Sequence, residues 1–351
     1  AAGAGAEEEG QGGGGVRFAL FADMGTARPD GSHHGIKEEF DAIKSMALIK
    51  HQHALGRGLD FVMHVGDVSY ADGYLARWDE FLMLIEPVAS EIPWMTAAGN
   101  HERDTTGTSR RVPARSFWEA GSSGGECGVP YAAHFPTGGP AAADADAPWY
   151  SFESGPVHIT VISSEHDFTM GSNQYQWIKS DFENVDRKVT PWLIFASHRP
   201  LYVHSEGAGS PEEDQDAAAL LRLHLEPLLL AHRVDLAAYG HHHSYQRTCP
   251  LAAGACQQPR GGRRAPVHLV AGMAGRSLST NVDAASRPAW VEAFNNEEHG
   301  VLFVEADYSS LTVKFYADCV DLTSNYNPES ISKNVEEQLE TCIRDEFTLE
   351  K

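Results

Sequence analysis

VDLAAYGHHHSYQRTCP, residues 234–250, joins an apolar segment to three consecutive histidines, and it decides how the rest of the chain is interpreted. The run VDLAAY predicts a buried strand, and the histidines follow where that strand ends. A purification tag would lie at a terminus, so that origin is excluded. Two explanations remain, a metal site and a chance surface cluster, and the other strands of the chain distinguish them.

Five further apolar runs end in a polar residue or a glycine, as this one does, and each predicts a buried strand. They are RFALFAD, LDFVMHVGD, IPWMTAAGN, WLIFASH and VHLVAGM, which begin at residues 17, 59, 92, 192 and 267. Helical spacing of apolar residues occupies 33–55, 77–90, 173–185 and 216–233, with Ser172 the expected N-cap of the third helix. Hairpins are expected in 150–165 and 300–317. This alternation predicts an α/β layered domain with antiparallel additions.

The bulk composition narrows the class of partner. The formal net charge is -22, from 49 acidic and 27 basic residues, and such a surface repels nucleic acid polymers and anionic lipid. No apolar run reaches the length that spans a bilayer. Residues 1–15, AAGAGAEEEGQGGGG, have no apolar region of a signal peptide, so we expect a flexible Gly/Ala-rich tail or linker there. Residues 16–351 are expected to form the catalytic domain.

The five cysteines contain no CxxC pair. Cys249 and Cys256 flank a short Ala/Gly loop, and Cys319 and Cys342 bracket a polar segment, so each pair is a candidate disulfide. Cys127 is left over. Two such bridges favour an oxidising compartment.

The polar residues that follow the predicted strands are the candidate site. In open α/β sheets, ligands bind outside the carboxyl ends of the strands. Oxygen and imidazole donors from separate strand ends suit one or two divalent or trivalent cations. Two metals that share a bridging carboxylate clamp a phosphoryl group. The candidates are Asp23, Asp67, Tyr70, Asn100, His101, His198 and His241–His243.

These residues resemble a known family. FADMG, GDVSY, GNHE, SHRP and GHHH follow, in order, the five-block pattern of the calcineurin-like metallophosphoesterases. That superfamily usually has a histidine two residues after the first aspartate, where this chain has Gly25; Tyr70, three residues after Asp67, replaces it. This exchange is typical of the purple acid phosphatases. GNHERD, SGGECGVP, SSEHD, GHHHSYQRTCP and DEFTLEK are similar to plant-type members with phosphodiesterase or diphosphonucleotide phosphatase activity.

The resemblance implies a fold and a cofactor. The fold is a four-layer αββα sandwich with mixed sheets and metals at the C-terminal strand ends. The implied cofactor is Fe(III) with a divalent Fe, Zn or Mn. Fe(III) would be bound by Asp23, Tyr70, His243 and a bridging Asp67, and the divalent ion by Asn100, His198, His241 and the same Asp67. The chemistry agrees independently, because phenolate and carboxylate are hard anionic donors suited to a trivalent ion.

The implied reaction is the hydrolysis of a small phosphorylated substrate, in which hydroxide held by the metals attacks phosphorus. His101 would face the substrate and hydrogen-bond a phosphate oxygen or protonate the leaving alkoxide. His204 is a further candidate, because the family often has substrate-contacting histidines in this loop, although LYVHSEGAG matches them poorly. Arg199 and Glu102 are expected to orient the ligands.

Three functions remain open. The first is an acid phosphatase, a phosphoric ester hydrolase that is secreted or lies in an endomembrane or vacuolar lumen. The second is a phosphodiesterase or nucleotide pyrophosphatase on the same fold. The third is a metal-retaining structural or binding protein with little activity. Three departures favour it: Gln246 where the family has glutamate, the poor match around His204, and the missing N-terminal β-sandwich of plant-type enzymes.

The three consecutive histidines are not expected to be equivalent. An extended backbone sends alternate side chains to opposite faces, so His241 and His243 would reach one side together. His242 would point away and act as a spacer.

Overall fold

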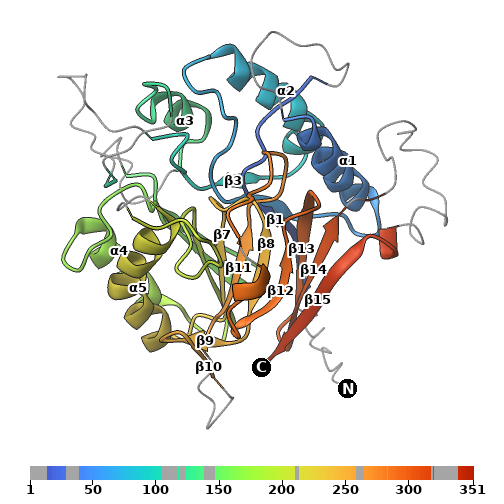
Figure 1. Cartoon of the computed structure of the whole chain (residues 1–351). Coiled ribbons are helices and arrows are strands. Elements are labelled where there is room, and N and C mark those ends of the chain that lie inside the picture. Colours follow the sequence, from blue (N-terminus) through green and yellow to red (C-terminus); the bar gives the residue numbers. More distant parts are fainter. Residues whose placement is uncertain are drawn as a thin grey trace, which may run out of the picture.

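The computed structural model of the chain describes residues 14–28, 39–103, 117–118, 123–137, 147–209, 213–257, 265–282, 284–317, 319 and 339–351. Two β-sheets lie face to face between two layers of helices (Figure 1). This confirms the four-layer αββα architecture with mixed sheets. The expected tail lies almost wholly outside the described residues, and the division into a tail and one domain stays a prediction.

The first sheet has the strand order β15-β14-β13-β1-β2-β3. Its parallel part is β1 (Val16–Phe21), β2 (Phe61–His64) and β3 (Trp94–Thr96), and its antiparallel part is β13 (Gly300–Ala306), β14 (Ser310–Ala317) and β15 (Ile343–Glu350). Helices α1 (Asp41–Ala54) and α2 (Ala76–Ala89) connect the parallel strands and pack on the outer face of this sheet.

The second sheet has the order β12-β8-β11-β7-β6-β5-β4. Parallel pairing joins β5 (Val157–Val161), β6 (Trp192–Ser197), β7 (Leu236–Tyr239) and β11 (Val267–Ala271). The antiparallel strands are β4 (Tyr150–Ser154), β8 (Tyr245–Thr248) and β12 (Val291–Asn295). Helices α4 (Asn173–Asn184) and α5 (Asp214–Ala231) cover its outer face. Four short elements complete the described fold: α3 (Val129–His134), β9 (Leu251–Ala252), β10 (Ala255–Cys256) and the 3-10 helix η1 (Ala284–Ser286).

Strand β6 explains why the central strands are apolar along their whole length. Its Trp192, Ile194 and Ala196 belong to the cluster between the two sheets. Leu193 and Phe195, which alternate with them, pack under α4 and α5 instead. Because both faces of the strand are covered, neither face selects for polar residues. The runs therefore become polar only where each strand ends, which is where the site lies.

The expected strands and hairpins form, and a helix lies in each of the four expected ranges. Residues 33–38 of the first range lie outside the described residues, and α1 begins at Asp41. The Ser172 side chain caps α4 by accepting a hydrogen bond from the backbone nitrogen of Tyr175 at 3.1 Å. Strands β8, β9, β10, β12 and β15, helix α3 and the 3-10 helix η1 were not expected. Alternate positions of β15 are exposed, and its sequence, IRDEFTLE, is too polar to indicate a strand in a sheet core.

The expected disulfide between Cys249 and Cys256 is present and ties together β9 and β10. Cys319 and Cys342 contact the same apolar cluster, and the pairing expected for them stays a prediction. Among the described residues, no helix combines the length and the apolar character needed to cross a bilayer.

Candidate metal centre

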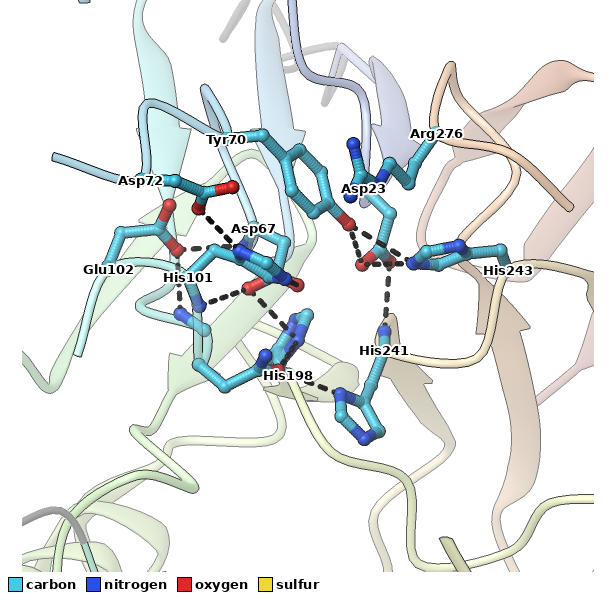
Figure 2. Close-up of polar contacts among 12 residues, drawn as sticks. Asp23, Asp67, Tyr70, Asp72, His101, Glu102, His198, His241, His243 and Arg276 are labelled. Atoms are coloured by element: carbon cyan, nitrogen blue, oxygen red, sulfur yellow. Dashed lines mark hydrogen bonds and ion pairs between the residues drawn. The ribbon is translucent and has the colours of Figure 1, made fainter. Parts of the chain in front are cut away.

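The carboxyl ends of the parallel strands bring the predicted donors together. Phe21 pairs with His64 and His64 with Thr96, so the loops after β1, β2 and β3 leave the first sheet at one level. Ser197 pairs with Tyr239 in the same way in the second sheet. Figure 2 shows the side chains from these loops pointing toward one another.

The first group of donors contains Asp23, Tyr70 and His243. The Tyr70 hydroxyl lies 3.0 Å from Asp23 Oδ1 and 3.1 Å from His243 Nε2. His243 Nε2 and Asp23 Oδ1 are 3.5 Å apart. The Nδ1–H of His243 donates to the Ser277 carbonyl at 2.7 Å, which leaves Nε2 free to bind an ion.

The second group contains Asp67, Asn100, His198 and His241. Asp67 Oδ1 lies 3.3 Å from His198 Nε2, which lies 3.1 Å from Asn100 Oδ1. Asn100 Oδ1 is in turn 2.8 Å from His241 Nδ1. Donor atoms of Asp67, His198 and His241 all lie within 4.8 Å of one another.

Both groups fit a bound metal ion. Two ligands held about 2.1 Å from one ion at tetrahedral or octahedral angles are themselves about 3.0–3.4 Å apart, close to the separations in both groups. The first group offers a phenol, a carboxylate and one imidazole, and the second offers two imidazoles, an amide and a carboxylate. The residues present therefore suit a harder and a softer cation.

Backbone strain concentrates at this site. Asp23, Asp67, Tyr70, Asp72 and His241 all have positive φ, from 48° to 69°. They are five of eight such non-glycine residues in the described part of the chain. Each left-handed residue costs roughly 1–3 kcal/mol, and such strain clusters where side chains must be aimed. A tyrosine is especially unfavourable there because of its bulk.

Burial and neighbouring charges together lower the pKa of one donor, Asp67, and raise the pKa of another, Tyr70. Burial alone would raise the pKa of Asp67, but His198 and His101 hold the pKa of this carboxyl well below its usual range. Burial, and then the charge of Asp23, raises the pKa of Tyr70 well above its usual value. The phenol therefore keeps its proton until a cation displaces it, because metal coordination deprotonates such ligands.

Glu102 holds two of the donor loops in place, as expected. Its carboxylate accepts hydrogen bonds from the backbone nitrogens of Asp67, Val68 and Gly99 at 2.8–2.9 Å. A Cβ on Gly99 would lie 2.2 Å from Asp67 Oδ1, so only glycine lets this loop approach the carboxylate. Burial and the nearby Asp67 raise the pKa of Glu102 to about 8.

Arg199 also contacts a donor. Its guanidinium is buried, binds Glu165 at 2.8 Å, and places one nitrogen 3.2 Å from His241 Nε2. A carboxylate oxygen of Asp214, at the start of α5, lies 3.7 Å from the same nitrogen. When Nδ1 of His241 binds an ion, Nε2 carries the proton and requires an acceptor, which Asp214 offers and Arg199 does not.

His101 lies beside the donors, on the more open side of the site. Its backbone nitrogen donates to Asp67 Oδ1 at 2.9 Å, and its ring Nδ1 lies 2.7 Å from Asp72 Oδ1. His101, His241 and His243 are 17–19% exposed at the side chain, whereas Asp23 is fully buried. The site is therefore more open to solvent on the side of these histidines.

His204 has a different environment from the other predicted site residues. Its ring meets Phe294 with centroids 5.5 Å apart, and its backbone binds Gln246 through both its nitrogen and its carbonyl. Its role in substrate binding stays a prediction.

The His242 side chain points away from those of His241 and His243, as expected, but the cause differs from the expected one. The chain bends through residues 241–244, with His241 at a φ of 69°, so alternation along a strand is not the reason. The His242 ring turns away, is buried, and lies 2.8 Å from the Ser244 hydroxyl through Nδ1.

Three residues of the site were missed by the sequence interpretation. Asp72 lies two residues after Tyr70 in the same loop. Arg276 follows β11, so the rule that placed the other candidates at strand ends applied to it as well. Glu39, which binds Arg276, precedes α1 and had no signal in the sequence.

Comparison with known proteins identifies the family. Residues 16–245 match the family model of calcineurin-like phosphoesterases, and residues 265–324 match that of iron/zinc purple acid phosphatase-like protein C. The nucleotide pyrophosphatase/phosphodiesterase of Hordeum vulgare is 35% identical over 310 residues, which cover 85% of this chain and 78% of that protein.

Other relatives are longer. Probable inactive purple acid phosphatase 27 of Arabidopsis thaliana is 36% identical and covers 85% of this chain, but the match spans only 47% of that protein. The chain thus spans about half the length of this Arabidopsis relative and of another that is 37% identical, probable inactive purple acid phosphatase 1. The structure of a purple acid phosphatase from yellow lupin seeds superposes with a TM-score of 0.75 at 31% identity, over 96% of this chain and 54% of that one. From these matches and from the arrangement of its strand-end residues, the chain belongs to the purple acid phosphatase family of calcineurin-like phosphoesterases.

Proposed function

We propose that the protein hydrolyses phosphoric esters at a dinuclear site that holds Fe(III) and a divalent Fe, Zn or Mn. The observation that supports this most directly is the pair of donor groups, three and four side chains, whose donor atoms lie about one ligand–ligand distance apart. Asp67 Oδ1 faces His198 at 3.3 Å and Oδ2 lies 3.9 Å from His101 Nε2. Asp67 would be the carboxylate that the two ions share.

When bound, the two ions supply Lewis acidity that activates water and neutralises charge on the phosphoryl group. The residues of the chain then have separate tasks. Asp23, Tyr70 and His243 would hold the trivalent ion, and Asn100, His198 and His241 the divalent one. Glu102 fixes the loops on which Asp67 and Asn100 lie, so both groups keep their spacing.

His101 is the proposed proton donor. Its Nδ1–H donates to Asp72, which leaves Nε2 directed toward the donors, 3.9 Å from Asp67 Oδ2. Burial would lower the pKa of His101, but Asp67 and Asp72 raise it above its ordinary value. The ring is therefore protonated under mildly acidic conditions, and Nε2–H can be delivered to the leaving alkoxide.

The proposed substrate is a small phosphorylated molecule in an oxidising lumen or outside the cell. The Cys249–Cys256 disulfide supports that compartment. The excess of acidic residues disfavours a nucleic acid polymer as the substrate.

The test combines metal analysis with a visible spectrum. We expect two metals per chain and a tyrosinate-to-Fe(III) charge-transfer band that disappears in Tyr70→Phe. His242→Val is the control, because its ring turns away from the donors, and both metals and the band should survive. A colourless protein that holds only divalent metals would refute the iron assignment.

A phosphodiesterase or nucleotide pyrophosphatase is the second candidate. It is supported by the barley relative, which carries that name and of which this chain covers 78%. Parallel assays on a phosphomonoester, a bis-ester and a dinucleotide separate the two. Turnover of the dinucleotide well above that of the monoester selects the second candidate.

A metal-retaining protein with little activity is the third. Its support is that several Arabidopsis relatives are named probable inactive purple acid phosphatases. Protein that binds two metals but hydrolyses none of the three substrates selects this candidate.

A further inference from the structure

Arg276 lies over the ring of Tyr70. Its guanidinium carbon is 4.5 Å from the centre of the ring. Figure 2 shows the Arg276 side chain near Tyr70 and Asp23. A cation over an aromatic face is attracted by the electrons of the ring. The side chain comes from the loop after β11, which supplies none of the seven predicted ligands.

Glu39 fixes this position. Its Oε1 accepts a hydrogen bond from Arg276 at 2.5 Å, and its other oxygen binds Arg77. Glu39 and Arg77 are both buried. The guanidinium is therefore held by an ion pair beneath the surface, and its place over the ring is not one of many conformations of a solvated side chain.

Gly25 makes room for this ion pair. A Cβ on Gly25 would lie 2.8 Å from Glu39 Cγ and 2.9 Å from Glu39 Oε2, and the glycine has a φ of +67°. Gly25 is the position where the wider superfamily has a histidine. In this chain, Glu39 occupies the space beside it and holds Arg276 against Tyr70, the residue that replaces that histidine.

The loop that begins at Arg276 contacts the other two residues of the first donor group as well. The backbone nitrogen of Arg276 donates to the Asp23 carbonyl at 2.9 Å. His243 Nδ1–H donates to the Ser277 carbonyl, and the His243 backbone nitrogen donates to the Ser279 hydroxyl at 2.9 Å. One short segment thus touches Asp23, Tyr70 and His243, the three residues proposed to hold the trivalent ion.

We infer that Arg276 is a positioning residue that tunes the Tyr70 ligand, with a fixed positive charge stacked on its ring and anchored by Glu39. This inference rests on the proposed function, because it assumes that Tyr70 binds the trivalent ion as a phenolate. The guanidinium lies over the face of the ring, whereas an ion bound to the hydroxyl would lie beyond the edge of the ring, so the charge is nearer to the ring than to that ion. It therefore stabilises the electrons of the phenolate more than those of the metal.

Two measurable consequences follow. Stabilising the phenolate electrons increases the energy needed to move one of them to Fe(III), so Arg276 should place the charge-transfer band at shorter wavelength. A weaker phenolate donor and a nearby cation both favour Fe(II), so Arg276 should also raise the midpoint potential of the iron.

The test compares purified, iron-loaded wild-type protein with Arg276→Gln. We expect the band of R276Q to move to longer wavelength and its midpoint potential to fall, with iron content equal to that of the wild type. Arg77→Gln is the matched control, since it removes the same charge from the same carboxylate but not from the Tyr70 ring. Its band should stay within error of the wild-type wavelength.

The Arg276→Lys variant distinguishes an effect of the positive charge on Tyr70 from a purely structural role of the Arg276 side chain. Lysine keeps the charge but not the planar stacking, so its band should lie between those of the wild type and R276Q. If R276Q loses iron but R276K retains it with an intermediate band, the inference stands.

Three results overturn the inference. They are an unchanged band and potential in iron-loaded R276Q, an equal shift in R77Q, and loss of iron in both R276Q and R276K, which would indicate a purely structural role. A wild type without the band is a different failure, because it refutes the proposed iron site itself.

Discussion

Two carboxylates, those of Asp67 and Asp72, position His101. Asp67 accepts a hydrogen bond from its backbone, and Asp72 lies 2.7 Å from its Nδ1. Because His101 is not among the predicted ligands, His101→Ala should retain both metals. We expect kcat to fall by about 10²–10⁴, the usual contribution of a positioned general acid. Loss of the metals in this variant would place His101 among the ligands instead.

Asp72, together with Asp67, raises the pKa of His101. Burial lowers the pKa of His101, and Asp67 and Asp72 raise it to a net value above the ordinary one. A general acid works below its pKa, so activity should decline as pH rises through this raised value. In Asp72→Asn the alkaline limb of the kcat profile should move to lower pH. A profile that keeps its shape, with only its height reduced, would argue against this role.

Gln246, which departs from the family, acts as both donor and acceptor. Its Oε1 accepts from the His204 backbone nitrogen at 2.7 Å, and its Nε2 donates to the His204 carbonyl and the Ser244 hydroxyl at 3.0 Å. An ionised glutamate accepts but cannot donate, so Gln246→Glu would face the His204 carbonyl with a negative oxygen.

We expect Gln246→Glu to lower the free energy of unfolding by about 1–3 kcal/mol at pH 7, the usual cost of an unsatisfied buried group. Urea denaturation measures it. At low pH the protonated carboxyl can donate, so the difference should narrow. Gln176→Glu, the same change at an exposed position of α4, is the control and should have little effect. Equal midpoints for both variants would contradict the role of the Gln246 amide.

At the scale of elements, the buried strands contain histidines that oppose stability in acid. His64 ends β2 among Phe21, Phe81 and Trp94, and burial lowers its pKa to about 3. The unfolded chain binds this proton below about pH 6.5, whereas the folded chain does so only near pH 3. Stability is therefore lost as pH falls through this window, by up to roughly 5 kcal/mol.

His64→Leu should remove that loss. Between pH 6.5 and 4, the unfolding midpoints of the variant should fall less steeply than those of the wild type. The difference between the two slopes corresponds to the one proton that His64 takes up on unfolding. Parallel curves for the two proteins would mean that His64 binds its proton equally well in the folded and unfolded states.

At the scale of the whole molecule, the site joins the two sheets. Asp23, Asp67 and Asn100 come from loops of the first sheet, and His198 and His241 from loops of the second. An ion bound to both sheets is lost on unfolding, so it stabilises the folded chain by about 2.7 kcal/mol at a hundredfold excess over its Kd.

Chelation should therefore lower the melting temperature of the wild type. Asp67→Asn removes the carboxylate proposed to be shared by both ions. A chelator should no longer change the melting temperature of this variant. A chelator effect that persists in this variant would show that the metals do not depend on Asp67.

The sequence by itself determined the apolar parallel strands, the four long helices, two hairpins and the polar residues at the strand ends, but not the more polar strands such as β15. Apolar runs that become polar at one end are a local property, so Asp23, Asp67 and His198 were identified without coordinates. The sequence also showed that Gly25 stands where the wider superfamily has a histidine, and that Tyr70 replaces that histidine as a donor.

Only the tertiary structure decided what surrounds these residues. Glu39 and Arg276 are 237 positions apart, and nothing near either one indicates that they meet beside Gly25. The turn of His242 away from the site depends on a bend in the backbone and on Gln246 and Ser244, not on strand alternation. Strand ends are set by short-range pattern, whereas the contacts that orient ligands arise from packing between distant segments, which a local pattern does not contain.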